Sequence, residues 1–127
     1  MLVEHRNVRQ IRGEGYRRWF SDDYFDLIVW FDRIGGGQST ISGFQLCYDR
    51  SGYERALTWT RADGFSHEQV DSGENHPGGM KSTPILVADG LFDSAGVASR
   101  FRQVSKGIDP EIAGLVMDKL AEYPGSL

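Results

Sequence analysis

One short segment restricts the fold of this chain more than any other, because its apolar side chains alternate strictly. From Tyr24 to Asp32 every odd-numbered residue is apolar, while the even-numbered positions include Asp26 and Trp30. Successive side chains of a strand point to opposite faces, so this period of two predicts a half-buried β-strand. Its aromatic and β-branched residues favour the same structure. The apolar positions are Phe25, Leu27, Val29 and Phe31.

Turn residues after this segment predict that it belongs to an antiparallel meander. Three glycines at 35–37 allow a turn, and a second strand is expected from Ser39 to Asp49. Ser51 and Gly52 then lead into a third strand, Glu54 to Thr60. Residues 3–11 and 16–20 are expected to form one or two further strands, and residues 85–88 a short one.

The apolar patterns of these strands also predict how they pair. One sheet face becomes continuously apolar in a single register, and a slip of one residue would break that face. The pairs expected in this register are Phe44–Trp59, Leu46–Leu57, Tyr48–Arg55, Leu27–Phe44 and Phe25–Leu46.

Two helices are expected after the strands. Asp93 or Ser94 is a candidate N-cap, followed by an apolar stripe of Val97, Phe101 and Val104. A second helix starts at Asp109–Pro110. Its apolar residues recur at steps of three and four. They are Ile112, Leu115, Val116, Leu120 and Tyr123. Strands followed by helices predict a single α+β domain, an antiparallel β-meander of four to six strands with two C-terminal helices packed on one sheet face.

Charge and composition argue against several classes of function. The net charge of −4 opposes general nucleic-acid binding. However, residues 1–18 carry five arginines and two glutamates, so this end is basic and could contact an anion or an acidic subunit surface. No apolar run is long enough to span a membrane, and the N-terminus lacks the apolar core of a signal peptide. The single cysteine, Cys47, favours a reducing cytoplasm and is expected to be a buried, inert thiol.

The stretch from Arg61 to Pro84 has no hydrophobic period and is predicted to be a long loop. It holds four candidate metal ligands, His67, Asp71, Glu74 and His76. Imidazoles and carboxylates bind zinc, and they also serve as general acids and bases. The spacing matches no specific metal motif, so a solvated loop explains the same residues.

A second candidate site lies on the mixed face of the predicted sheet. Tyr24, Asp26, Trp30 and Gln45 could line a small-ligand pocket, because such pockets combine an apolar wall with a few polar groups. The alternative is that Trp30 packs under a C-terminal helix while Asp26 pairs locally.

Two segments carry a family resemblance. Residues 43–59, GFQLCYDRSGYERALTW, and 81–93, KSTPILVADGLFD, resemble a family of small bacterial proteins of unknown function. The resemblance implies a cytoplasmic bacterial protein and supplies no activity, cofactor or catalytic residue.

From the residues themselves we expect a non-catalytic module, without a resident cofactor, that binds a small molecule or another protein and forms a homodimer. The alternative is a metal-assisted hydrolase in which His67, Asp71, Glu74 and His76 hold zinc. A third hypothesis is an anion or nucleic-acid contact through the arginines of residues 6–18, which fails if those arginines pair with the acidic body.

Overall fold

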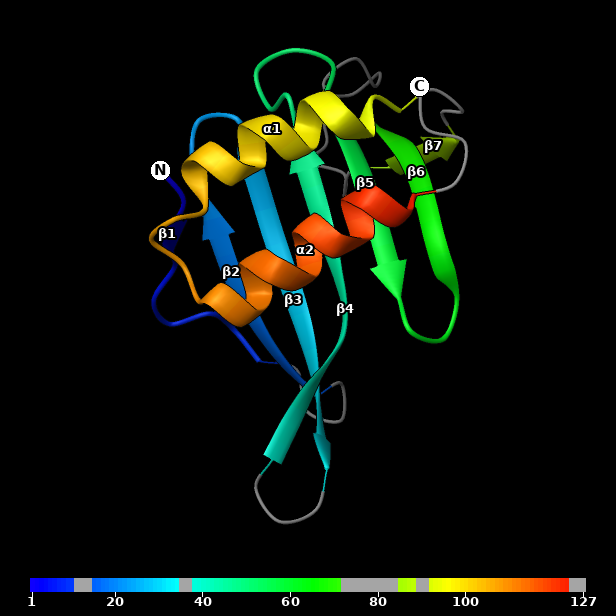
Figure 1. Ribbon diagram of the computed structural model, residues 1–127. Helices are drawn as coiled ribbons and strands as arrows, with labels where there is room; N and C mark the ends of the chain where they lie inside the picture. Colours follow the sequence, from blue (N-terminus) through cyan, green and yellow to red (C-terminus); the bar gives the residue numbers. More distant parts are fainter. Residues whose placement is uncertain (11–14, 35–37, 72–84, 89–91, 124–127) are drawn as a thin grey trace, which may run out of the picture.

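The computed structural model describes residues 1–10, 15–34, 38–71, 85–88 and 92–123. Within these residues, seven strands form one antiparallel sheet in sequence order, and two helices follow (Figure 1). Six strands have four or more residues, and β1 adds a two-residue edge, so the predicted α+β meander is confirmed. The strands are β1 (Val3–Glu4), β2 (Tyr16–Ser21), β3 (Phe25–Ile34), β4 (Gln38–Tyr48), β5 (Arg55–Thr60), β6 (Gly64–Asp71) and β7 (Ile85–Ala88); the helices are α1 (Ser94–Val104) and α2 (Pro110–Glu122).

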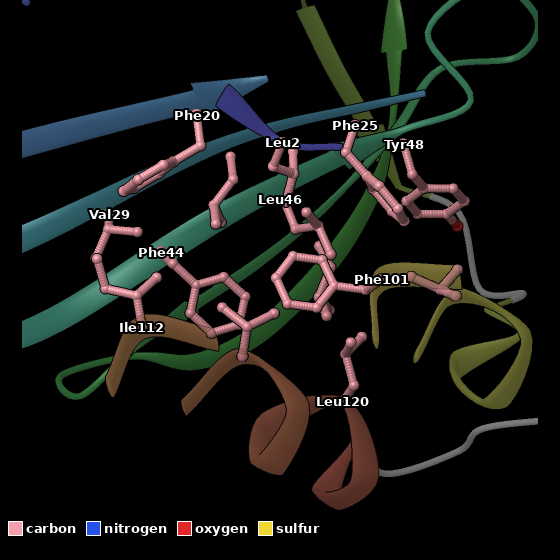
Figure 2. Packing of buried hydrophobic residues seen from close by; sticks show 14 of the residues in the cluster. Leu2, Phe20, Phe25, Val29, Phe44, Leu46, Tyr48, Phe101, Ile112 and Leu120 are labelled. Carbon is pink, nitrogen blue, oxygen red and sulfur yellow. The ribbon is translucent and has the colours of Figure 1, made fainter. Parts of the chain in front are cut away.

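Both helices cover the same face of the sheet, and the core lies between the helices and this face (Figure 1). The alternation in β3 places its odd-numbered side chains on this face, where they meet the apolar stripes of the helices. Figure 2 shows Phe44 and Leu46 of β4 approaching Ile112 and Leu120 of α2. Side chains with no more than 1% of their surface exposed include Phe25, Leu27, Val29, Phe44, Leu46, Leu57, Phe101, Ile112, Val116 and Leu120.

Both helices begin at the predicted capping residues. The Asp93 carboxylate accepts a hydrogen bond from the Gly96 backbone N–H at 3.1 Å. The Asp109 carboxylate accepts one from the Glu111 N–H at 3.0 Å. Its second oxygen lies 3.1 Å from the Arg18 guanidinium, so this cap also ties α2 to β2.

The predicted pairing of β4 with β5 is confirmed, including Phe44 opposite Trp59 and Leu46 opposite Leu57. The predicted pairing of β3 with β4 is wrong by two residues, since Leu27 lies opposite Leu46. The error has a physical cause. β3 ends at Ile34, which pairs with Gln38 at the start of β4, and a β-bulge shifts the register between Trp30 and Phe31. If the pairing of Ile34 with Gln38 continued without the bulge, Leu27 would lie opposite Gln45. Ser42, the extra residue in β4, returns the apolar face of β4 to the core.

Two other predictions of extent are wrong. Of residues 3–11, which were expected to contain a longer strand, only Val3–Glu4 is a strand among those described. The expected loop from Arg61 to Pro84 contains strand β6, and residues 72–84 lie outside the described residues. The alternation of β6 places Phe65 and His67 on the helix-covered face. A histidine in a core position does not register in a search for apolar periodicity, which explains the error.

Candidate functional site

The face of the sheet opposite the helices carries the candidate site. Neither helix covers this face, which holds the even-numbered side chains of β3. Among them Asp26, Ile28 and Trp30 are half-buried. An aromatic residue on an uncovered sheet face still exposes apolar surface, so this face is where a ligand or partner could bind.

A cavity of about 490 Å³ opens on this face beside the β-bulge. At the bulge, the Ser42 hydroxyl donates a hydrogen bond to the Trp30 carbonyl at 3.2 Å. Gly43 lies opposite Trp30 in the neighbouring strand, so no side chain stands beside the indole at that position. Trp30, Asp32, Ser42, Thr60, Arg61, Ala62 and Asp63 line the cavity.

The turn between β5 and β6 forms one side of the cavity, and Arg61 ties it to the bulge by hydrogen bonds to backbone carbonyls of β4. The Arg61 backbone N–H donates to the Ser42 carbonyl at 2.8 Å, and Nη2 of the Arg61 guanidinium donates to the Ile41 carbonyl at 2.6 Å. Within the turn, the Asp63 N–H donates to the Thr60 hydroxyl at 3.0 Å. Gly64 closes the turn with a φ of +76°, a conformation that glycine adopts without strain. The walls of the cavity are therefore fixed relative to one another.

The cavity carries more negative than positive side chains. Asp32 and Asp63 are exposed, and the described residues supply no ion-pair partner for either carboxylate. Among the lining residues that the structure describes, Arg61 is the single cation. An indole wall beside carboxylates and hydroxyls combines apolar contact with a few orienting polar groups, which is the arrangement typical of small-molecule sites.

The structure brings only one of the four predicted ligand residues to this cavity. Trp30 lines it, so the alternative that Trp30 packs beneath a helix is wrong. Asp26 lies on the same face but four residues along β3, about 13 Å away; its carboxylate accepts a hydrogen bond from the Trp19 indole. Gln45 donates to the Thr58 hydroxyl at 3.2 Å. Tyr24 lies elsewhere, with the Arg100 guanidinium of α1 3.7 Å from its ring centre.

Asp32 and Thr60 belong to predicted strands, whereas the other lining residues come from two features that the sequence analysis missed, the bulge at Ser42 and the short turn at 61–63. One signal of the bulge is present in the sequence. The buried positions of β4 change parity, from Ile41 to Phe44 and Leu46, as they must where a strand contains one extra residue.

The candidate metal ligands do not form a site within the described part of the chain. His67 is 6% exposed, and its Nε2 lies 2.6 Å from the Tyr48 hydroxyl, below the helices. Its ring centre lies 4.5 Å from that of Phe92. The side chain of Asp71, together with Glu74 and His76, lies outside the described residues. Among the residues that are described, no group of three or more potential ligands occurs. The zinc site therefore stays a prediction.

Cys47 lies on the open face, opposite Ala56 and half-buried. Burial raises the pKa of its thiol to about 12, and the nearby Glu54 and Asp26 carboxylates act in the same direction. Burial and Asp26 also raise the pKa of Glu54. The thiolate is the reactive form of cysteine, so Cys47 has the character of the inert thiol that we expected.

Part of the positive charge of the basic N-terminal region is paired with carboxylates of the same molecule. Arg18 pairs with Glu4 at 2.7 Å and with Asp109 at 3.1 Å. The Arg17 Nε–H donates to the Arg9 carbonyl at 2.7 Å. The pairing of Arg18 with the acidic body weakens the hypothesis of an anion contact through this segment. Arg12 lies outside the described residues.

Comparison of the chain with models of protein families, with curated proteins and with solved structures found no match. The resemblance to small bacterial proteins and the cytoplasmic location it implies therefore stay predictions, as does the homodimer. None of the described helices is long and apolar enough to cross a membrane.

Proposed function

We propose that this chain is a non-catalytic binding module that holds a small molecule in the cavity beside Trp30. One observation carries the proposal: the bulge and the 61–63 turn border an open cavity of about 490 Å³ beside an indole, on the sheet face that neither helix covers. Small-molecule sites typically occupy roughly 300–1,000 Å³ and combine an aromatic wall with a few polar groups. The cavity has both properties.

The way in which the cavity is built supports binding. Arg61 contacts the carbonyls of Ile41 and Ser42, so the turn and the bulge are held together before any ligand arrives. A site with walls fixed in this way loses little conformational entropy when it is filled. Most of the interaction with a ligand then remains available as affinity.

The same hydrogen bonds favour binding over nucleophilic catalysis. The Ser42 hydroxyl donates to the Trp30 carbonyl, and the Thr60 hydroxyl accepts from the Asp63 backbone. Activation of a hydroxyl nucleophile needs an adjacent base, most often an imidazole. Among the described residues that line the cavity there is no histidine.

The test is a screen of fragment-sized probes of differing charge, followed in NMR spectra through the indole N–H signals of the three tryptophans. We expect at least one probe to shift the Trp30 signal saturably. Trp59 provides an internal reference, because it lies on the helix-covered face with the Lys119 ammonium over its ring. A screen in which no probe moves the Trp30 signal would refute the proposal.

A matched pair of variants separates binding in the cavity from binding elsewhere. Ala62 lines the cavity and is exposed, so Ala62→Phe should fill the space and abolish the response with the fold intact. Ala95, exposed on α1, receives the same change as a control and should leave the response unaltered. Equal responses in the two variants would place binding outside the cavity.

A further inference from the structure

The charges around the cavity restrict the ligand that it can hold. Asp32 is exposed at the next outward-facing position of β3 after Trp30, and Asp63 is exposed in the turn that follows β5. Neither carboxylate has an ion-pair partner among the described residues. Two carboxylates against one guanidinium leave the lining with one excess negative charge.

Arg61, the cation among the described lining residues, contacts the backbone of β4. The Nη2 atom of Arg61 donates to the Ile41 carbonyl at 2.6 Å, which holds the guanidinium against the β4 backbone. Within the described part of the lining, the two carboxylates and the indole are the groups that attract a cation. The negative face of an aromatic ring attracts a cation, and indole is the strongest of the side-chain rings in this respect.

We infer that the cavity binds a small organic cation of the ammonium class, held over the Trp30 indole and paired with Asp32 and Asp63. This inference rests on the proposed function of the same cavity. An ammonium group bearing methyl substituents suits these surroundings, because its surface is apolar and its charge is spread over that surface. Such a group contacts the indole face and still interacts with the carboxylates.

A pair of probes that differ only in charge tests the ligand class. Choline carries a trimethylammonium group, and 3,3-dimethylbutan-1-ol is its uncharged isostere of nearly the same shape. We expect choline to bind at least about tenfold more tightly, from one cation–π contact and two exposed ion pairs. Binding is followed through the Trp30 indole signal. Added salt should weaken the binding of choline and leave that of the alcohol unchanged, because salt screens exposed charges.

Two substitutions assign the contacts. Trp30→Leu should reduce choline affinity at least about fivefold, followed calorimetrically since the indole is lost. Asp32→Asn keeps the shape of an exposed side chain and should reduce the affinity about threefold. Asp118→Asn makes the same change at an exposed position of α2 and should have no effect.

The outcomes separate this inference from the proposed function. If the alcohol binds as tightly as choline, the inference that the ligand is a cation is refuted, and the proposed binding of a small molecule stands. The same holds if neutral or anionic fragments move the Trp30 signal while choline does not. Choline binding that survives Trp30→Leu unchanged also refutes the cation site. If no probe of any charge moves the Trp30 signal, both proposals fail.

Discussion

Replacement of Gly43 by alanine tests whether the sheet depends on close approach of its strands at the cavity. A β-carbon at position 43 would lie 2.5 Å from the Trp59 carbonyl oxygen and 3.0 Å from the Thr60 Cα. Both are backbone atoms of the paired strand β5, so neither can move aside as a flexible side chain could. Strands β4 and β5 must separate locally to admit a single methyl group.

The expected cost follows from two opposing effects. Forcing an extra methyl group into a packed site costs typically about 1–3 kcal/mol. Alanine also reduces the conformational freedom of the unfolded chain, which stabilises the folded protein by about 0.4–1 kcal/mol. We therefore expect Gly43→Ala to lower the free energy of unfolding by about 1–2 kcal/mol. The strain falls on the strand residue that faces Trp30, so the Trp30 indole signal should move as well.

Gly114→Ala provides the matched control, because the chemical change is identical and the surroundings differ. Gly114 is exposed in α2, and no heavy atom lies within 4 Å of its β-carbon position. In a helix interior alanine is favoured over glycine by about 1 kcal/mol, so this variant should be more stable than the wild type. Urea denaturation followed by circular dichroism measures both changes. If Gly43→Ala matches or exceeds the wild type in stability, the close approach does not constrain the sheet.

Three further predictions address the core, an ion pair and the cysteine. Leu46 is fully buried, so Leu46→Ala should lower the free energy of unfolding by about 2–5 kcal/mol in urea; a loss below about 1 kcal/mol would contradict the core assignment. The hydrogen bond from Arg18 lowers the pKa of Glu4 below its ordinary value of 4.5. The pair therefore stabilises the fold at pH values above 4.5, and this stabilisation is lost as the pH falls through the folded-state pKa. The difference in the free energy of unfolding between wild type and Arg18→Gln should therefore be largest near neutral pH and shrink in acid, with a size of about 1 kcal/mol because the pair is partly exposed; a difference independent of pH would count against the pair. With a pKa of about 12, Cys47 should react with a chromogenic disulfide reagent far more slowly in the folded protein than in urea at the same pH; equal rates would contradict its burial.

The fold was predictable where local and long-range preferences agree. The alternation around Leu27 and Val29 predicted a strand, and burial of both residues against the helices confirms its inward face. Asp93 and Asp109 predicted the helix starts because N-capping depends on side chains within the same turn. Strand β6 escaped prediction because His67 occupies a core position, where its bond to the Tyr48 hydroxyl satisfies a polar ring.

The candidate site was harder to predict, because its walls come from segments that only tertiary pairing brings together. Trp30 could be placed on the correct face by alternation. The partners that complete the cavity, Ser42 and Arg61, are separated from Trp30 by one and two connections of the meander. Polar residues such as Asp63 are routine in turns, so nothing local distinguished that turn from others.

The bulge connects the fold and the site through one requirement. The register in which Ile34 pairs with Gln38, continued regularly along the two strands, would direct the polar face of β4 into the core. One extra residue restores the match, and that residue is Ser42. The same insertion interrupts the strand ladder beside Trp30 and presents the Ser42 carbonyl to the Arg61 backbone, which holds the turn that closes the cavity. Deleting Ser42 would therefore affect more than the ligand site. It would turn Phe44 and Leu46 away from the helices unless the connection between β3 and β4 also changed its length by one residue.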